Sequence, residues 1–151
     1  MARYVTTVRT PRPPAEAFAY LADLRNFAEW DPGVRGVTQV DGEGGGPSTS
    51  FDVTVAGVGP GPDLTLRYRT VEHDAPHEVI VRADHALFTS EDRITVRADD
   101  DGDGSVVTYD ADLRFGGLLR LGDPVLRAVF GRIGDRAAAG LRHALEGERV
   151  A

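Results

Sequence analysis

The segment DPVLRAVFGRIGDRAAAGLRHALEG, residues 123–147, decides the fold. Asp123 is a good helix cap and Pro124 suits a first helical turn. The predicted helix runs to about Glu146, where Gly147 can end it. Apolar or small side chains recur on one stripe of this helix: Leu126, Val129, Phe130, Ile133, Ala137, Gly140, Leu141 and Ala144. At 1.5 Å per residue the helix is roughly 34 Å long, so its stripe needs a broad apolar partner.

That partner is predicted between residues 34 and 115, where apolar residues recur at every second position. Phe51, Val53 and Val55, for example, alternate with polar residues. Runs with one apolar and one charged face are typical of an antiparallel sheet that is wet on one side. Residues 1–10, rich in Thr, Val and Tyr, predict a first strand. Short loops make the later strands neighbours in a meander, so we expect about seven strands.

Two short helices are expected after the first strand. One begins near Pro14, and the other runs from Asp23 to about Trp30. Pro32 biases Asp31 away from helix, so the second helix ends there and Asp31-Pro32-Gly33 is assigned to a turn. The complete order predicts an α+β fold in which a curved antiparallel sheet wraps around the long C-terminal helix. Either side chains or a ligand would fill the space between them.

Composition limits the classes of function. The 151 residues are 41% hydrophobic and 27% charged, so residues 1–151 are expected to form a single domain. The net charge is −7 and all 17 basic residues are arginine, which argues against nucleic-acid partners and anionic membrane surfaces. Lack of cysteine excludes disulfides and thiol chemistry. With no membrane-spanning run and no signal-peptide region, we expect a cytoplasmic protein without integral membrane association.

Five segments resemble the START/SRPBCC superfamily, whose fold is the helix-grip fold, and within it bacterial polyketide cyclase/dehydrase-like proteins. The segments are FAYLADLRNFAEWDPGV (18–34), YRTVEHDAPHEVIV (68–81), DRITV (92–96), GSVVTYDADL (104–113) and the helix that opens at Asp123-Pro124. The resemblance implies a hydrophobic pocket between helix and sheet. Family ligands range from lipids to polyketides.

Polar residues stand out on the predicted inward face. Asp92 lies between Ser90 and Ile94 in the alternation, so its carboxyl group should point at the core. A buried carboxylate needs a partner, a solvated cavity or a raised pKa. It could act as a general base or anchor a ligand hydroxyl. Alternatively it lies at an edge or a bulge, or bonds to the backbone near the strand start, since a one-residue slip reverses every face. Tyr68 and Tyr109 either orient a ligand or pack with their hydroxyls at the rim.

Three further residues have two interpretations each. Trp30 forms either a lid over the cavity mouth or a packing anchor. His85, near a hairpin turn, suits acid–base chemistry at neutral pH, but the lack of a visible partner carboxylate favours a surface or loop histidine. Aromatase members of the family use an inward arginine, and Arg69 is the nearest candidate, although the alternation places it on the wet face. The catalytic candidates are Asp92, Tyr109 and His85. The predicted ligand-binding residues are Trp30, Phe51, Val53, Leu66, Tyr68, Val81, Asp92, Ile94, Tyr109, Leu113, Phe130 and Ile133.

We expect neither a metal nor a cofactor. The HDAPH segment (73–77) has a histidine spacing that metals use on helices, but Pro76 breaks any helix there. Residues 99–110 follow the spacing of a calcium loop, yet Asp110 replaces the usual glutamate and strands flank the segment, which favours a solvated hairpin turn. No glycine-rich phosphate or dinucleotide loop occurs.

Three functions remain open. The preferred one is binding, transport or sequestration of a small hydrophobic molecule such as a lipid or polyketide, because an apolar space is predicted and no convincing catalytic pair is visible. The alternative is a polyketide cyclase, aromatase or dehydratase that folds a poly-ketone chain, with proton transfer by Asp92, Tyr68, Tyr109 or His85. The third is a protein-interaction module with a filled core. The sequence leaves both a monomer and a homodimer open.

Overall fold

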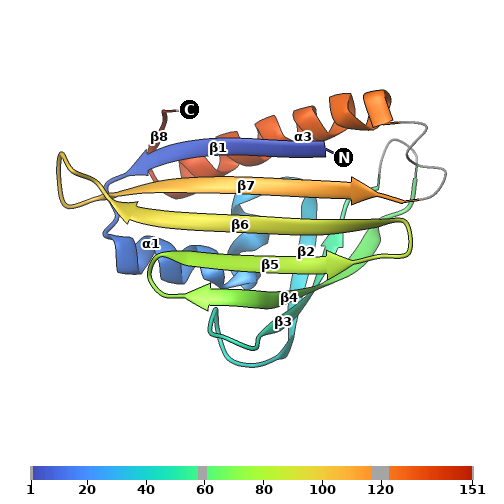
Figure 1. Ribbon diagram of the computed structural model, residues 1–151, viewed down its shortest axis with the longest axis horizontal. Helices are drawn as coiled ribbons and strands as arrows, with labels where there is room; N and C mark the ends of the chain where they lie inside the picture. Colours follow the sequence, from blue (N-terminus) through green and yellow to red (C-terminus); the bar gives the residue numbers. More distant parts are fainter. Residues whose placement is uncertain (1, 58–60, 117–122, 151) are drawn as a thin grey trace.

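The computed structural model describes residues 2–57, 61–116 and 123–150. Its strands form one antiparallel sheet in the order β2-β3-β4-β5-β6-β7-β1-β8 (Figure 1). The strands are β1 (Ala2–Thr10), β2 (Val34–Asp41), β3 (Ser50–Val55), β4 (Leu64–Asp74), β5 (Glu78–Asp84), β6 (Phe88–Ala98), β7 (Ser105–Phe115) and β8 (Glu148–Arg149). The α+β helix-grip prediction is confirmed, with the two-residue β8 added to the seven strands expected.

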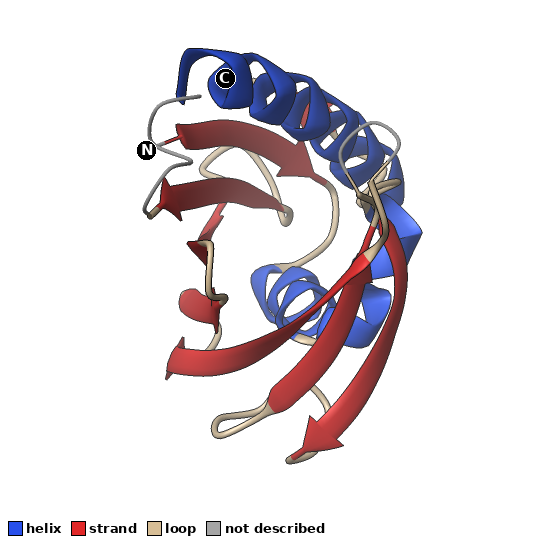
Figure 2. Ribbon diagram, turned by 90° about the vertical axis from the view of Figure 1, so that its right-hand side faces the viewer, coloured by secondary structure: helices blue, strands red, loops and turns tan. Residues whose placement is uncertain are grey.

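Helices cover the concave side of the sheet. They are α1 (Pro14–Ala22), the one-turn 3-10 helix η1 (Leu24–Asn26), α2 (Phe27–Trp30) and α3 (Asp123–Ala144). The bent sheet curves around α1 and α2, and α3 lies along β1 (Figure 2). In the described part of the chain, no helix has both the length and the apolar character needed to cross a membrane.

The placement of α3 differs in one respect from the sequence prediction. Gly140 was expected to face the sheet, but it lies against α2: a Cβ atom added there would sit 2.8 Å from the Trp30 carbonyl carbon. Gly134 does face the sheet, where an added Cβ would lie 2.8 Å from Tyr4 Cε2. The Tyr4 hydroxyl donates a 2.7 Å hydrogen bond to Asp135 Oδ1. α3 is therefore held between the inner side of β1 and α2, rather than across the middle of the sheet.

The end of α3 also differs from expectation. Glu146, not Gly147, adopts the left-handed backbone conformation, with φ of 54°. The Glu146 N–H donates to the His143 carbonyl and the Gly147 N–H to the Arg142 carbonyl, which is the hydrogen-bond pattern of a Schellman motif. Gly147 is required instead for close packing, because an added Cβ would lie 2.8 Å from Val8 Cγ1.

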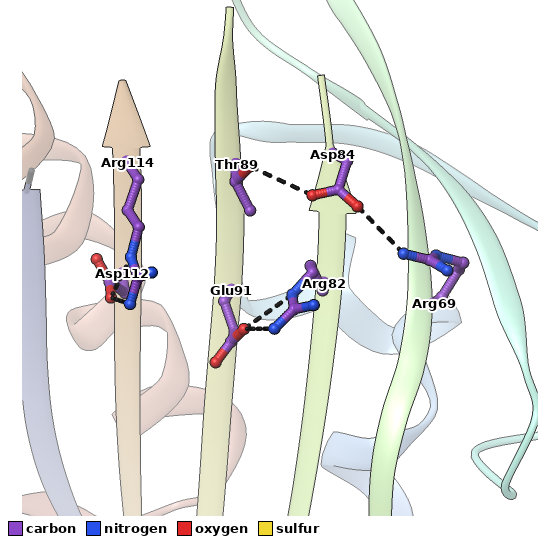
Figure 3. A network of polar contacts seen from close by, with 7 residues as sticks. All are labelled: Arg69, Arg82, Asp84, Thr89, Glu91, Asp112 and Arg114. Atoms are coloured by element: carbon purple, nitrogen blue, oxygen red, sulfur yellow. Dashed lines mark hydrogen bonds and ion pairs between the residues drawn. The ribbon is translucent and has the colours of Figure 1, made fainter. Parts of the chain in front are cut away.

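The outer face of the sheet is covered by ion pairs, as the alternation predicted. Arg69 pairs with Asp84 at 3.1 Å, and the next strands carry Arg82 with Glu91 and Arg114 with Asp112 (Figure 3). Partly exposed pairs of this kind contribute little stability each. Arg69 therefore points away from the interior and cannot serve as the inward arginine that the family resemblance suggested.

Candidate functional site

A carboxyl group and a phenol meet inside the protein. Asp92 on β6 and Tyr109 on β7 are 4% and 6% exposed, and the Tyr109 hydroxyl donates a 3.1 Å hydrogen bond to Asp92 Oδ2. Burial raises the pKa of Asp92 to about 7, although the bond from Tyr109 acts in the opposite direction. Burial likewise raises the pKa of Tyr109 well above its usual value. Asp92 can therefore exist in both protonation states near neutral pH.

A second polar pair lies beside the first on the inward face. Tyr68 on β4 and Ser90 on β6 share a 2.7 Å hydrogen bond in which either hydroxyl can be the donor. Ser90 stands two residues before Asp92 and so faces the same side of β6. The sequence analysis did not select Ser90 as a candidate; its place in the same alternation as Asp92 was the available indication.

Asp31 is the residue that the sequence analysis missed. It directly follows α2 and is only 8% exposed. Its Oδ1 accepts a 2.8 Å hydrogen bond from the Gly33 N–H, and burial raises the pKa of its carboxyl group. Its charge also helps to raise the pKa of Asp92, so the two carboxyl groups share one interior. Asp31 was assigned to the Asp-Pro-Gly turn, and that local role concealed its position.

Trp30 joins α2 to this cluster. Its ring contacts Tyr109 edge-on, with centroids 5.3 Å apart, and its ring centroid lies 4.7 Å from that of Phe27. Trp30 is buried. The structure thus places it as a packing anchor beside the polar cluster, while a lid role has no support in its position.

The predicted apolar lining is inward but unevenly covered. Besides Trp30, five of its members are buried: Phe51, Val53, Leu66, Val81 and Ile94. Leu113 and Phe130 are half-buried, as is Phe88, which also faces inward. Exposure therefore increases toward the end of the sheet where β6 begins, β7 ends and α3 starts, the end nearest the viewer in Figure 2. We call this end the mouth.

Two predicted site residues lie away from the cluster. Ile133 is 39% exposed, so it does not belong to the buried stripe of α3. His85 lies in the turn between β5 and β6, where its ring stacks on Phe88 at 4.9 Å. Its Nδ1 accepts a 3.2 Å hydrogen bond from the Leu87 N–H. At about 3.3 Å per residue the four positions from Phe88 to Asp92 span roughly 13 Å, so His85 does not contact Asp92.

Two pockets lie elsewhere on the molecule. One, of about 590 Å³, is open and lined by Arg9, Asp99, Glu146 and their neighbours. The other, of about 490 Å³, lies between α1, residues 45–46 and the β4–β5 turn. Neither includes Asp92 or its partners. In residues 2–57, 61–116 and 123–150 no group of three or more His, Asp or Glu side chains is arranged to hold a metal ion.

Comparison with known proteins identifies relatives. A profile of the family described as polyketide cyclase / dehydrase and lipid transport matches residues 1–146. The fold is similar to a START superfamily protein from Mycobacterium smegmatis, at 14% identity and a TM-score of 0.71 over 97% of this chain and 98% of that one. No curated protein matches the chain by sequence.

Two similar structures are named as aromatase/cyclases. The Zhui aromatase/cyclase from Streptomyces sp. R1128 has 16% identity and a TM-score of 0.71 over 95% of this chain and 93% of that one. The di-domain ARO/CYC StfQ from the steffimycin biosynthetic pathway has 14% identity and a TM-score of 0.69 over 96% of this chain and 50% of that one. Identities this low show a shared fold, whereas the family profile spans nearly the whole chain: this protein belongs to the polyketide cyclase/dehydrase and lipid transport family.

Proposed function

We propose that this protein binds a small hydrophobic molecule between the concave face of the sheet and α3, with the polar part of the ligand at Asp92, Tyr109, Tyr68 and Ser90. The observation on which this rests is the buried pair of Asp92 and Tyr109 beneath a half-buried apolar mouth. Family membership supports hydrophobic ligands at a general level.

A folding core does not need such a pair. Burial of a carboxyl group costs free energy unless the group is well bonded. Among the described residues, Tyr109 is the one hydrogen-bond donor to the Asp92 side chain, and it reaches Oδ2 alone. Oδ1 therefore remains available to a ligand that enters from the mouth, where Leu113 and Phe88 supply apolar contacts.

Binding of the uncharged dye Nile red tests this proposal. The wild-type protein should bind one dye molecule and shift its emission to the blue. In Leu113→Trp a large ring fills the mouth, so affinity should fall by at least about tenfold. Arg114→Trp is the matched control, because Arg114 is the next residue on β7 and faces outward. Absence of dye binding, or equal affinity in the Leu113 variant, would contradict the proposed site.

A second candidate function, cyclisation of a poly-ketone chain, is favoured by one observation. Asp92 has a pKa of about 7 and lies within hydrogen-bond distance of a phenol. Its carboxylate could remove a proton from a carbon between two carbonyl groups, and the resulting enolate would attack a third carbonyl carbon. The protonated Asp92 would then return the proton to the new alkoxide.

Variants separate the two functions. For an enzyme, Asp92→Asn should abolish turnover of a poly-ketone substrate while Nile red still binds, because the amide keeps the shape but cannot accept the proton. Tyr109→Phe should reduce turnover less. A wild-type protein that binds the dye but does not turn over such substrates is a binding protein.

A further inference from the structure

Charge is distributed unequally between the surface and the interior. Within the described residues, Asp31 and Asp92 are the only buried side chains of an ionisable acid or base other than tyrosine, whereas no arginine whose burial is described is buried. No arginine or histidine in that part of the chain forms an ion pair with either carboxyl group. The interior is thus acidic and lacks a countercharge.

The groups that face Asp92 reinforce this character. Tyr109 and Tyr68 flank it on the inward face, Asp31 adds its charge from the end of α2, and Asp110 and Glu91 act from the outer face. The charges of Asp31, Asp110 and Glu91 raise the pKa of Asp92, whereas the hydrogen bond from Tyr109 lowers it. The carboxylate oxygens of Asp92 and Asp31 only accept hydrogen bonds, and the Tyr109 hydroxyl hydrogen is already donated to Asp92.

From this arrangement we propose that the interior selects an apolar ligand whose polar end donates hydrogen bonds, such as an alcohol, a phenol or a protonated amine, and rejects one that ends in a carboxylate or phosphate. This inference rests on the proposed function. A buried anion without a cation incurs the full loss of hydration and is repelled by two carboxylates. A hydroxyl or ammonium group instead finds acceptors on Asp92 and Asp31.

Displacement of Nile red by three ligands of equal chain length tests the selection: dodecanol, dodecylamine and dodecanoate. The titrations are made at about pH 8, above the pKa of Asp92, so that its carboxylate form dominates. We expect dodecanol and dodecylamine to displace the dye, and dodecanoate to bind at least about tenfold more weakly than either.

Variants show whether the buried carboxyl groups are responsible. Asp92→Asn and, separately, Asp31→Asn should weaken dodecylamine and strengthen dodecanoate, because each replaces a charge with an amide of the same shape. Asp112→Asn is the control, since Asp112 lies on the outer face of β7 beside Arg114. Unaltered ligand preference in both interior variants would overturn the inference.

Different results would refute the two proposals. If dodecanoate competes as well as dodecylamine, the selection is refuted, while dye binding and its loss in Leu113→Trp still support the interior site. If the wild-type protein does not bind the dye, the proposed function fails and the selection is overturned with it.

Discussion

Replacement of Gly140 by alanine tests whether α3 packs closely against α2. A Cβ at this position would lie 2.8 Å from the Trp30 carbonyl carbon and 3.4 Å from its Cα, and Cβ atoms essentially never approach another heavy atom within 3.0 Å. Because the obstacle is backbone, α3 and α2 must separate. Alanine favours a helix over glycine by about 1 kcal/mol, but overpacking costs about 1–3 kcal/mol. We expect a net loss of up to about 2 kcal/mol.

Urea unfolding followed by circular dichroism measures this loss, and thermal unfolding should show a decrease in Tm of up to about 8 °C. Trp30 is the sole tryptophan, so its fluorescence reports directly whether α2 has moved. Gly131→Ala is the control within the same helix, because an added Cβ there meets no heavy atom within 4 Å; it should stabilise the protein by up to about 1 kcal/mol. If Gly140→Ala proves as stable as Gly131→Ala and leaves the Trp30 emission unchanged, α3 does not lie against α2.

Two further predictions concern stability. The free energy of unfolding should fall as pH rises from about 4 to above 7, because folded Asp92 retains a proton that the unfolded chain releases near its ordinary pKa of 3.8. Asp92→Asn should remove a pH dependence on the order of a few kcal/mol, measured as urea midpoints across this range, and an unchanged slope would refute it. Glu146→Gly should increase the free energy of unfolding by less than about 1 kcal/mol, and so raise the urea midpoint slightly, because glycine adopts the left-handed backbone of residue 146 without strain. Gly147→Ala should lower it, since its Cβ would strike Val8; the opposite order of these two variants would contradict the described end of α3.

Much of the site could be predicted because a strand has a strict period of two. The alternation was enough to place Asp92 and Tyr109 on one face and Arg69 on the other. The bond between Asp92 and Tyr109 was not predictable, because it depends on the register between β6 and β7, where Asp92 opposes Ala111 and Tyr109 opposes Ile94. Their roles toward a ligand stay predictions.

Other parts of the site depend on contacts between segments that are distant in sequence. Asp31 was read as a turn residue, since a local pattern contains no information about the strands that later surround it. Ile133 fits the helical stripe, yet it is exposed because α3 is rotated and held by Tyr4 and the Trp30 backbone rather than by the middle of the sheet. Periodicity defines a stripe but not the partner that covers each position along it.

Local chemistry was therefore sufficient for the element order, the helix-grip fold and the separation of an apolar inner face from a charged outer face, because each follows from side-chain periodicity along the chain. The proximity of Asp31 and Asp92, the packing of α3 against α2 and the half-buried apolar residues at the mouth were decided only by packing in three dimensions. Burial and the lack of a nearby cation are properties of the assembled interior, and these are what raise the pKa of Asp92 to about 7.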